Sequence, residues 1–490
     1  MIMTRPLLLS LVLASACLHD TTPNPVVAAP LPTAYSAGDA EPAPEREPSV
    51  ERRADAGWWL QYDDVTLHAL VDRALRNNYT LRQRFAAIQQ AEALRRQASG
   101  LRWPTVNGLA TLSRSRSVGF FGANTSDRLD ASLPISYEVD LFARRAGDAR
   151  AARDEVRASE LDMEAAAISL SAEVAEAWYD VVDARAELVT LTQQRETNET
   201  YLELTQLRFQ QGLASAVDVH QQRQQTAASR ARLELTTGTL AVAGQQLALL
   251  LGEPPGSVDV ASLGPEMVAM PELGATPDPG VPGTLVQNRP DVLAARRRVE
   301  AADRRIGGLV SARLPTLTVQ FSPGWQWFRT DADLTQNTAR GFTYTAGATL
   351  NVPVFDGMVA AGRVDQQRGV LQQQLEQLGD LVLRALVEVE GALVLERQQR
   401  RNLELVRTQL AIAGDTLAAS RDRYRAGLSD FLPVLTAIQA QQNTEVQLLD
   451  ANRGLVSQRI QLHRALGGSW PASLTAPEPS TPTEGEDPAR

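Results

Sequence analysis

The chain has 490 residues, of which 43% are hydrophobic, 22% are charged and only 5% are aromatic. Its formal net charge is −10 and all 48 basic residues are arginine, so it lacks the basic balance expected of a nucleic-acid-binding protein. A single cysteine excludes a disulfide within the chain, and four well-separated histidines offer no metal-ligand spacing. We therefore expect no nucleic-acid partner, no metal and no cofactor.

Residues 1–16 have the composition of a bacterial secretion signal, with one arginine, an apolar run and then small residues directly before Cys17. This pattern resembles a lipobox, in which the cysteine is acylated and becomes the first residue of the mature protein. Ala14 stands where such motifs usually carry leucine, and an ordinary signal peptide before a chance cysteine is the alternative. We expect lipidation of Cys17, and Leu18 after it favours delivery to the outer membrane.

Both ends of the chain are poor in core-forming residues. Residues 17–57 are rich in proline, alanine and threonine and predict a flexible, lipidated tether. Residues 468–490 are similar and predict a disordered tail.

Between these ends the sequence contains two similar halves. The string RFQQGLASAVDV begins at Arg208, and RYRAGLSDFLPV begins 215 residues later at Arg423. Pro104 and Pro315 lie in similar strings at an offset of 211. Landmarks in one order at nearly one offset indicate an internal duplication of about 200 residues. The predicted division is a first repeat, an equatorial inter-repeat linker and a second repeat, at residues 58–252, 253–283 and 284–467.

The predicted elements follow the same order in each half: a helix, two strands, a very long helix, a turn and a further helix. The predicted helices occupy residues 79–102, 143–211 and 217–251, and then 291–313, 358–426 and 432–466. Apolar residues along the long helices recur with 4-3-4-3 spacing, from Leu161 to Val189 and from Leu371 to Ala392. This period is typical of coiled coils. A simple dimeric coiled coil is one explanation of the helices, but it leaves the strands unexplained.

Strands are predicted at about residues 105–118, 128–141, 315–328 and 341–354. Three of the four alternate apolar and polar residues, which fits either a soluble sheet on a core or a membrane barrel with lipid outside and water inside. Four aromatic residues are candidates for a girdle at the membrane interface, namely Trp325, Trp327, Phe342 and Tyr344. Four strands cannot close a barrel, so a membrane-inserted chain must assemble; three copies would give twelve strands, although the sequence itself does not fix that number.

An enzyme is not expected. The sequence has no GxSxG motif, no cysteine–histidine pair and no phosphate-binding loop. A periplasmic coiled-coil lipoprotein scaffold without a pore is the alternative from another class, and it predicts no lipid-facing strands.

Several strings together resemble the TolC-like outer-membrane efflux proteins, and the lipidated NodT/OprM-like branch most of all. These strings are WWLQYDDVTLHALVDRALRNN from Trp58, LRWPT, ARLPT, VPVFDG and, as the most specific match, RPDVLAARRRVEAADRRIG from Arg289. The first-half counterpart of the Arg289 motif is degraded to Asn78 and the two residues after it. The resemblance covers residues 58–466.

The resemblance implies a mainly α-helical protein with a membrane β-barrel portion. Members of that family form trimers in which a twelve-stranded outer-membrane β-barrel continues into a twelve-helix periplasmic α-barrel, and the resemblance implies the same assembly here. They export small molecules and drugs received from an inner-membrane pump, here expected to be of the RND type, through a periplasmic adaptor protein. The runner-up within this class is the outer-membrane conduit of type I protein secretion.

The resemblance also implies functional positions. The turns of the two repeats would dock on the adaptor through Gly212, Leu213, Ala214, Ser215, Gly427, Leu428, Ser429 and Asp430, whereas the alternative is that each is merely a helix turn. Leu432 is expected to form an apolar pore constriction. Thr436 occupies a position where some relatives carry aspartate, so Asp422 is expected to supply negative charge near the mouth instead.

Overall fold

The computed structural model describes residues 57–119, 122–264, 269–277, 279–332 and 335–468, together with residues 32, 34 and 35. The predicted signal peptide, Cys17 and the tail after residue 468 lie outside these ranges. The chain divides into two compact units, which we describe separately. The strand unit comprises Ala87–Glu160 and Ala294–Asp380, and the hairpin unit comprises the described residues of Ala29–Ala86, Leu161–Leu293 and Leu381–Arg490.

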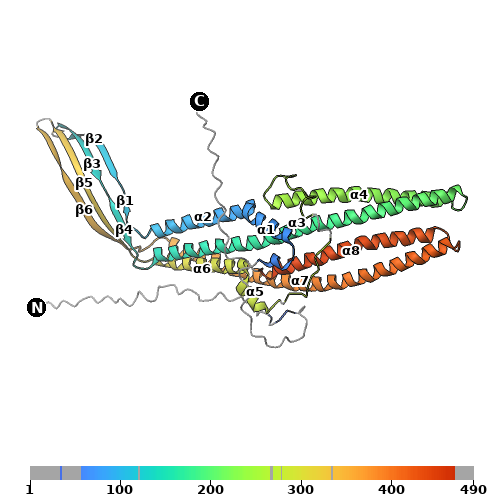
Figure 1. Cartoon of the computed structure of the whole chain (residues 1–490). Helices are drawn as coiled ribbons and strands as arrows, with labels where there is room; N and C mark the ends of the chain where they lie inside the picture. Colours follow the sequence, from blue (N-terminus) through green and yellow to red (C-terminus); the bar gives the residue numbers. More distant parts are fainter. Residues whose placement is uncertain are drawn as a thin grey trace, which may run out of the picture. The chain divides into compact units, whose positions relative to one another are not determined.

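The helices of the two halves have matching lengths (Figure 1). Two helices have 67 residues each, or about 100 Å of helix by the rise per residue. The described helices are η2 (Trp58–Gln61), α1 (Val65–Asn77), α2 (Tyr79–Gly100), α3 (Arg144–Gln210), α4 (Ala216–Leu250), α5 (Pro282–Asn288), α6 (Pro290–Ser311), α7 (Val359–Arg425) and α8 (Leu432–Ala465). The six predicted helices agree with these bounds to within two residues, whereas η2, α1 and α5 were not predicted. Among the described residues, no helix combines the length and the apolar character needed to cross a membrane.

The strand unit contains one antiparallel sheet. Its strands are β1 (Thr105–Val106), β2 (Leu109–Gly119), β3 (Gly122–Ser132), β4 (Ile135–Val139), β5 (Thr316–Ala332) and β6 (Thr335–Asn351). The neighbour order is β1-β4-β5-β3-β2, and β6 pairs along the other side of β5. The predicted bounds 315–328 and 341–354 were wrong at the hairpin end, because backbone pairing continues past the point where apolar alternation stops. Charged residues such as Arg329 and Asp331 occupy that end.

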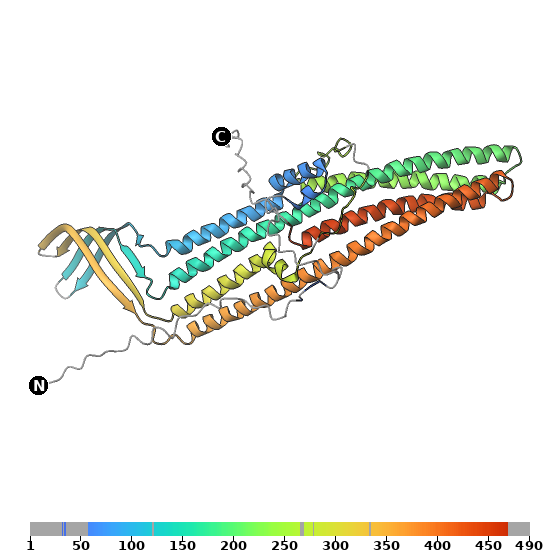
Figure 2. The same ribbon diagram turned by 60° about the horizontal axis from the view of Figure 1, so that its bottom comes forward.

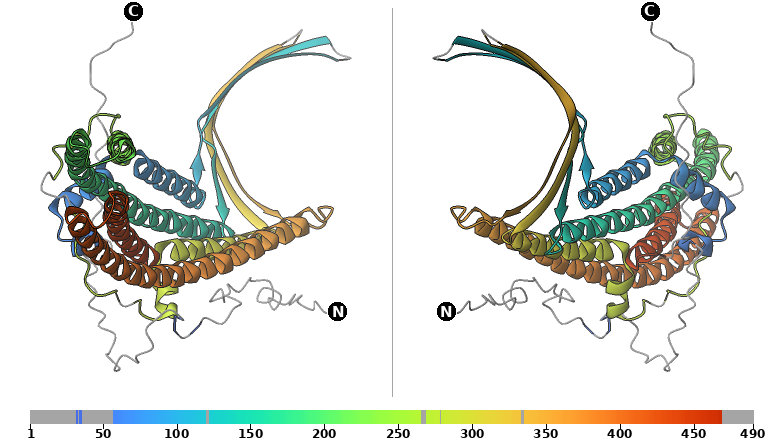
Figure 3. Two further views of the ribbon diagram at one scale, coloured as in Figure 1. Left: turned by 90° about the vertical axis from the view of Figure 1, so that its right-hand side faces the viewer. Right: turned by 90° about the vertical axis from the view of Figure 1, so that its left-hand side faces the viewer.

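The two predicted strands of the first half are each interrupted, one between β1 and β2 and the other between β3 and β4. Both interruptions lie at the same height of the curved sheet (Figure 3). Proline has no amide N–H, and Pro134 and Pro323 both lie at this level. The ladder nevertheless crosses the break, since Leu133 N donates to Pro323 O at 2.9 Å. Gly324 permits the close approach of β3 here, because a Cβ at that position would lie 2.8 Å from Ala131 O.

The core of the hairpin unit is built around two tryptophans on different elements. Trp58 Nε1 donates to Ser171 Oγ at 2.9 Å, and Trp178 Nε1 donates to Asp64 Oδ2 at 2.7 Å. Asp64 also accepts from the amide at the start of α1 and caps that helix. The coiled-coil seam predicted on the long helices is buried over most of its length, with Val189 as an exception at 48% exposure.

One joint occurs in both halves of the hairpin unit. Asn78 lies between α1 and α2 and donates from Nδ2 to Leu250 O, at the end of α4, at 2.9 Å. Arg289 lies between α5 and α6 and donates from Nη1 to Ala465 O, at the end of α8, at 3.0 Å. Asn78 is therefore the structural counterpart of Arg289, and although the motif is degraded in the first half, its shorter amide side chain makes the equivalent contact with a helix end.

One residue of the predicted tether has a defined environment. Tyr35 is 7% exposed, and burial raises the pKa of its hydroxyl with a further contribution from Glu390. The side chain of Tyr35 therefore packs near Glu390 of α7.

Candidate functional site

The first hairpin reverses between α3 and α4 (Figure 2), and the hydrogen bonds of this turn form a Schellman motif. Leu213 N donates to Arg208 O at 2.8 Å, and Gly212 N donates to Phe209 O at 3.0 Å. Gly212 has φ of +72°, which an L-residue adopts only with strain. This backbone reversal is the physical reason for glycine in the first copy of the repeated string.

The turn of the second hairpin, between α7 and α8, repeats the motif. Leu428 N donates to Arg423 O at 2.9 Å and Gly427 N donates to Tyr424 O at 3.1 Å, again with φ of +72° at the glycine. Leu213 and Leu428 are 62% and 71% exposed. Two apolar side chains are thus presented at equivalent places, one on each hairpin.

The two hairpins differ at the start of their second helices. Ser215 forms a capping box with Asp218, in which Ser215 Oγ accepts from Asp218 N and the Asp218 carboxylate accepts from Ser215 N. At α8 the equivalent place is taken by Phe431, which has no side-chain cap bond and is 2% exposed. Phe431 packs with Val434 and Leu435, and Pro433 lies in the first turn, where its missing N–H costs nothing.

Phe431 is not among the residues predicted from the sequence, although apolar residues three, four and seven positions later carry the signal. The remaining predicted docking residues differ in exposure. Ser215 and Asp430 are exposed, whereas Ala214 and Ser429 are half-buried. The structure thus brings the four predicted residues of each tip together within one turn.

Two cation–π contacts join the hairpins near their turns. The Arg208 guanidinium lies 4.4 Å from the centroid of Tyr424, and that of Arg421 lies 5.4 Å from the centroid of Tyr201. Each pair takes its arginine from one hairpin and its tyrosine from the other. The arginine of the first copy of the repeated string therefore contacts the aromatic residue of the second copy.

Further along the same interface the hairpins meet through buried amides. Asn198 of α3 and Gln442 of α8 exchange two hydrogen bonds, at 3.2 and 3.3 Å. Gln225 of α4 also donates to Gln442, and Ser229 accepts from Asn198 at 2.6 Å. This interface between α3, α4 and α8 is therefore polar, in contrast to the apolar stripes along the two long helices.

The residues predicted to form a constriction fall in two places. Leu432 is 51% exposed on the first turn of α8, and Thr436 lies one turn later with its hydroxyl bonded to Leu432 O at 2.8 Å. Asp422 is on α7, where its carboxylate lies 4.0 Å from Arg425. The structure therefore brings Leu432 and Thr436 together and leaves Asp422 on the neighbouring helix.

All four predicted girdle residues lie on one face of the sheet. Trp325 is directly opposite Phe342, and Tyr344 opposes Pro323, so side-chain alternation places Trp327 on the same face. Figure 3 shows how this sheet curves. The other face carries polar pairs, including Gln326 Nε2 donating to an Asp130 carboxylate oxygen at 2.7 Å.

The apolar face has a defined height. On β5 it runs from Leu317 to Trp327, which is about 33 Å of strand and about 25 Å of height at the tilt usual for membrane strands. At the end of this band Arg340 lies opposite Trp327, and Arg329 follows beyond it on the same face. An apolar band of this height, ending at aromatic and then charged residues, suits the hydrocarbon layer of a bilayer.

A sheet with one lipid-suited face, carried by a chain of long paired helices, defines the class of outer-membrane channel proteins that combine strands with helical hairpins. The sequence profile described as outer membrane efflux protein matches residues 70–253 and 281–468. The chain therefore belongs to the outer membrane efflux protein family, whose members are channels of the outer membrane.

Individual relatives match over nearly the full chain. The pyoverdine export outer membrane protein OpmQ of Pseudomonas aeruginosa is 29% identical over 482 residues, covering 94% of this chain and 97% of that protein. The outer membrane protein OprJ of the same species is 28% identical over 470 residues, covering 95% of each. The solved structure of the outer-membrane channel OprN has a TM-score of 0.78 at 25% identity, covering 90% of this chain and 97% of that one. This family membership excludes the alternative of a periplasmic coiled-coil scaffold without a pore.

Proposed function

We propose that three copies of this chain form a conduit with a closed twelve-stranded barrel and a twelve-helix periplasmic tube. The supporting observation is that the sheet has two unpaired edges among the described residues. β6 has 17 residues and pairs only with β5, and β2 pairs only with β3, among the described residues. Unpaired backbone groups in an apolar band are very costly, and joining β6 of one copy to the β1–β2 edge of the next removes both edges.

The particle mass tests this assembly. The protein is extracted from outer-membrane fractions in mild detergent and measured by light scattering corrected for detergent. About three chains per particle is the expected result. A particle of one or two chains, or one that leaves the membrane without detergent, would overturn the barrel.

The two halves are proposed to be a tandem repeat. Matching helix lengths and the shared joint at Asn78 and Arg289 support it. In a trimer the repeat would give each part of the tube a near-sixfold arrangement from only three chains.

The hairpin tips are proposed to dock on a periplasmic adaptor protein that links the conduit to an inner-membrane pump. The exposed Leu213 and Leu428 are the support, since isolated apolar side chains on a rigid turn are suitable anchors for a partner. The double variant Leu213→Asp/Leu428→Asp should abolish efflux while the particle mass stays unchanged. Leu235→Asp, at a residue of α4 that is 73% exposed, is the matched control and should transport normally. Equal efflux by both variants would refute docking through these leucines.

The closed conduit is proposed to narrow where Leu432, Thr436 and Asp422 of three copies face the axis. Leu432→Ser should raise single-channel conductance in planar bilayers, because it removes an apolar ring. Asp422→Asn should lower the preference for cations without widening the pore. Unchanged conductance and selectivity in both variants would place the constriction elsewhere.

Cys17 is proposed to be acylated and to anchor each copy in the outer membrane. Mass spectrometry of the mature N-terminus tests this, with Cys17→Ser as the control. The exported material is proposed to be small organic molecules supplied by a proton-driven pump, by analogy with a relative named for pyoverdine export. Accumulation of dyes in cells lacking the protein tests this, and normal dye export with lost protein secretion would favour the type I alternative.

A further inference from the structure

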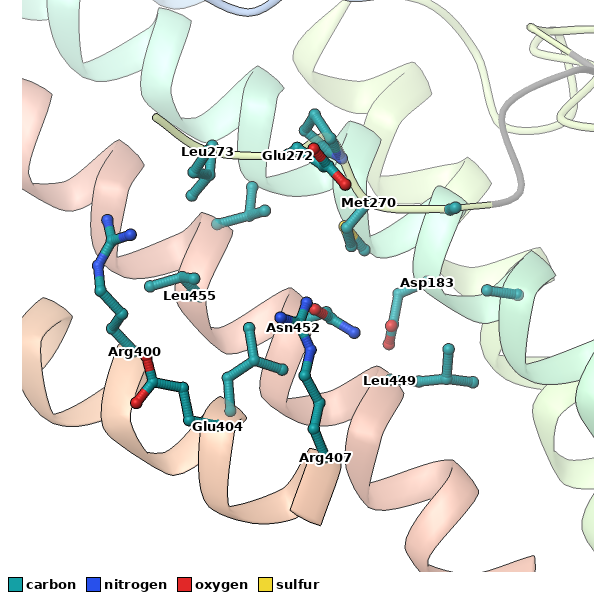
Figure 4. Close-up of a pocket in the computed structure, with 15 residues that line it drawn as sticks. Asp183, Met270, Glu272, Leu273, Arg400, Glu404, Arg407, Leu449, Asn452 and Leu455 are labelled. Carbon is teal, nitrogen blue, oxygen red and sulfur yellow. The ribbon is translucent and has the colours of Figure 1, made fainter. Parts of the chain in front are cut away.

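A pocket of about 500 Å³ lies in the hairpin unit beneath the inter-repeat linker (Figure 4). Its walls come from α3, from residues 269–273 of the linker, and from α7 and α8. Both hairpins and the segment that connects the two halves therefore meet around one cavity. Its volume lies within the range of small-molecule sites.

The walls combine apolar and charged side chains, and the apolar ones come from α7, α8 and the linker. Leu403 of α7 and Leu455 of α8 are 6% and 7% exposed and form one side of the cavity. Leu449 lies at the end of the pocket near Asp183, and Met270 and Leu273 reach in from the linker (Figure 4). An organic group could be enclosed between these side chains without exposing apolar surface to water.

Asp183 of α3, which is half-buried, contributes a carboxylate to this cavity. Among the described residues, no hydrogen bond or ion pair reaches its carboxylate. Arg453, whose charge acts on the Asp183 carboxylate, already bonds Glu176 and Asp180 at 2.6 and 2.7 Å. Burial, with the neighbouring Asp450 carboxylate, raises the pKa of Asp183 to about 6. At neutral pH the pocket thus holds an ionised carboxylate without its own cation.

The other charges around Asp183 come from every element of the wall. Acidic groups predominate, and the charged residues are Asp180 and Glu187 on α3, Asp450 and Arg453 on α8, Arg400, Glu404 and Arg407 on α7, and Glu272 on the linker. Arg400 is bonded to Glu396 and to Gly274 O, both at 3.2 Å. Arg407 is the remaining cation that lines the pocket, and it is exposed. The balance favours a positively charged occupant.

We propose that this pocket binds an amphipathic organic cation, with its positive group beside Asp183 and its apolar body against Leu403, Leu449 and Met270. This site is built from other residues than the proposed tips and constriction, so it goes beyond the proposed transport function. A bound molecule would contact α3 of the first hairpin and α7 and α8 of the second. It would therefore hold the two hairpins and the linker in their present arrangement.

Titration of the purified full chain with ethidium, a planar aromatic cation, tests the proposal by fluorescence anisotropy. One ethidium should bind per chain, and Asp183→Asn should weaken binding about tenfold, since a charge-assisted contact is lost. Asp415→Asn is the matched control, because Asp415 is an exposed carboxylate elsewhere on α7. It should bind ethidium as the wild type does, whereas Arg407→Gln should bind it more tightly.

Acidification supplies a second readout. Wild-type affinity for ethidium should fall as the pH is lowered through about 6, because Asp183 takes up a proton, and Asp183→Asn should show no such fall. The anionic dye 8-anilinonaphthalene-1-sulfonate should bind weakly and should not respond to Asp183→Asn in the same direction. Equal binding of both dyes would overturn the claim of charge selection.

Filling the cavity tests its location. Leu449→Trp on α8 and Met270→Trp on the linker approach the pocket from different sides, and each should abolish ethidium binding while circular dichroism remains that of the wild type. If both folded variants bind ethidium normally, the site is refuted. These outcomes are independent of the particle mass, so the failure of the conduit and the failure of this pocket are distinguishable.

Discussion

Gly427 at the tip of the second hairpin offers a direct test of why glycine recurs in the repeated string. Its φ is +72°, and a Cβ built there meets no atom within 4 Å. Gly427→Ala would therefore introduce no clash, and its whole effect would come from the backbone conformation. An L-residue in this region costs about 1–2 kcal/mol, and the lower entropy of the unfolded chain offsets part of it.

We expect Gly427→Ala to destabilise the tip by about 1 kcal/mol. Gly427→Asn should cost much less, because asparagine tolerates the left-handed region. Gly414→Ala is the matched control. Gly414 lies within α7 and also has no atom within 4 Å of a built Cβ, so alanine there should stabilise the helix by up to about 1 kcal/mol.

Amide hydrogen exchange of the segment around the turn measures this locally, where a global melting curve would be insensitive. A change of 1 kcal/mol corresponds to about fivefold in the exchange rate. Exchange should be faster in Gly427→Ala, near the wild type in Gly427→Asn and slower near position 414 in Gly414→Ala. Equal acceleration by alanine and asparagine would refute the conformational explanation and would point to loss of a contact made by the glycine backbone.

Three other substitutions test the packing of the hairpin unit. Arg459→Met removes two of the bonds to the buried Glu396 carboxylate, at 2.6 and 3.0 Å, leaves those from Thr276 and Arg400, and should cost about 3 kcal/mol in thermal unfolding. Adding Glu396→Leu should restore most of it, and a double variant as unstable as the single one would contradict this. Asp183→Asn should stabilise the protein at pH 7.5 by on the order of 1 kcal/mol after solvent screening, with the gain shrinking as the pH falls through about 6, because a raised carboxyl pKa destabilises the fold only where the group is ionised. Asn78→Ala should cost about 1–2 kcal/mol and speed amide exchange at the start of α2, because it removes a helix cap and the bond to Leu250 O; unaltered exchange would show that the joint is dispensable.

The long helices and the class of protein were predictable because their signals are local and repeated. The 4-3-4-3 spacing from Leu161 onwards identifies a buried seam whatever lies opposite. The seven residues of α5 carry no such period, and the helix ends at Arg289, whose side chain bonds the end of α8. The end of β5 and the start of β6 were not predicted for a related reason, since backbone pairing there does not require an apolar face.

The contacts of the tips could be predicted only in part. Glycine followed by leucine indicates a reversal, and both reversals are present as Schellman motifs. That Arg208 lies on Tyr424 depends on two hairpins meeting in space, and no spacing within either copy encodes it. The same applies to Asp183, whose lack of a partner results from the prior engagement of Arg453.

The polarity of the hairpin interface bears on how a conduit could open. Asn198 and Gln442 exchange amide bonds that water can replace, so separating α8 from α3 costs less than exposing an apolar seam of the same area. The joints at Asn78 and Arg289 lie instead beside the tryptophan core and fix the ends of α4 and α8. Movement is therefore favoured at the tips and resisted at the joints. An iris-like opening of the second hairpin would use this difference, and an organic cation held beside Asp183 would oppose it by tying α3 to α7 and α8.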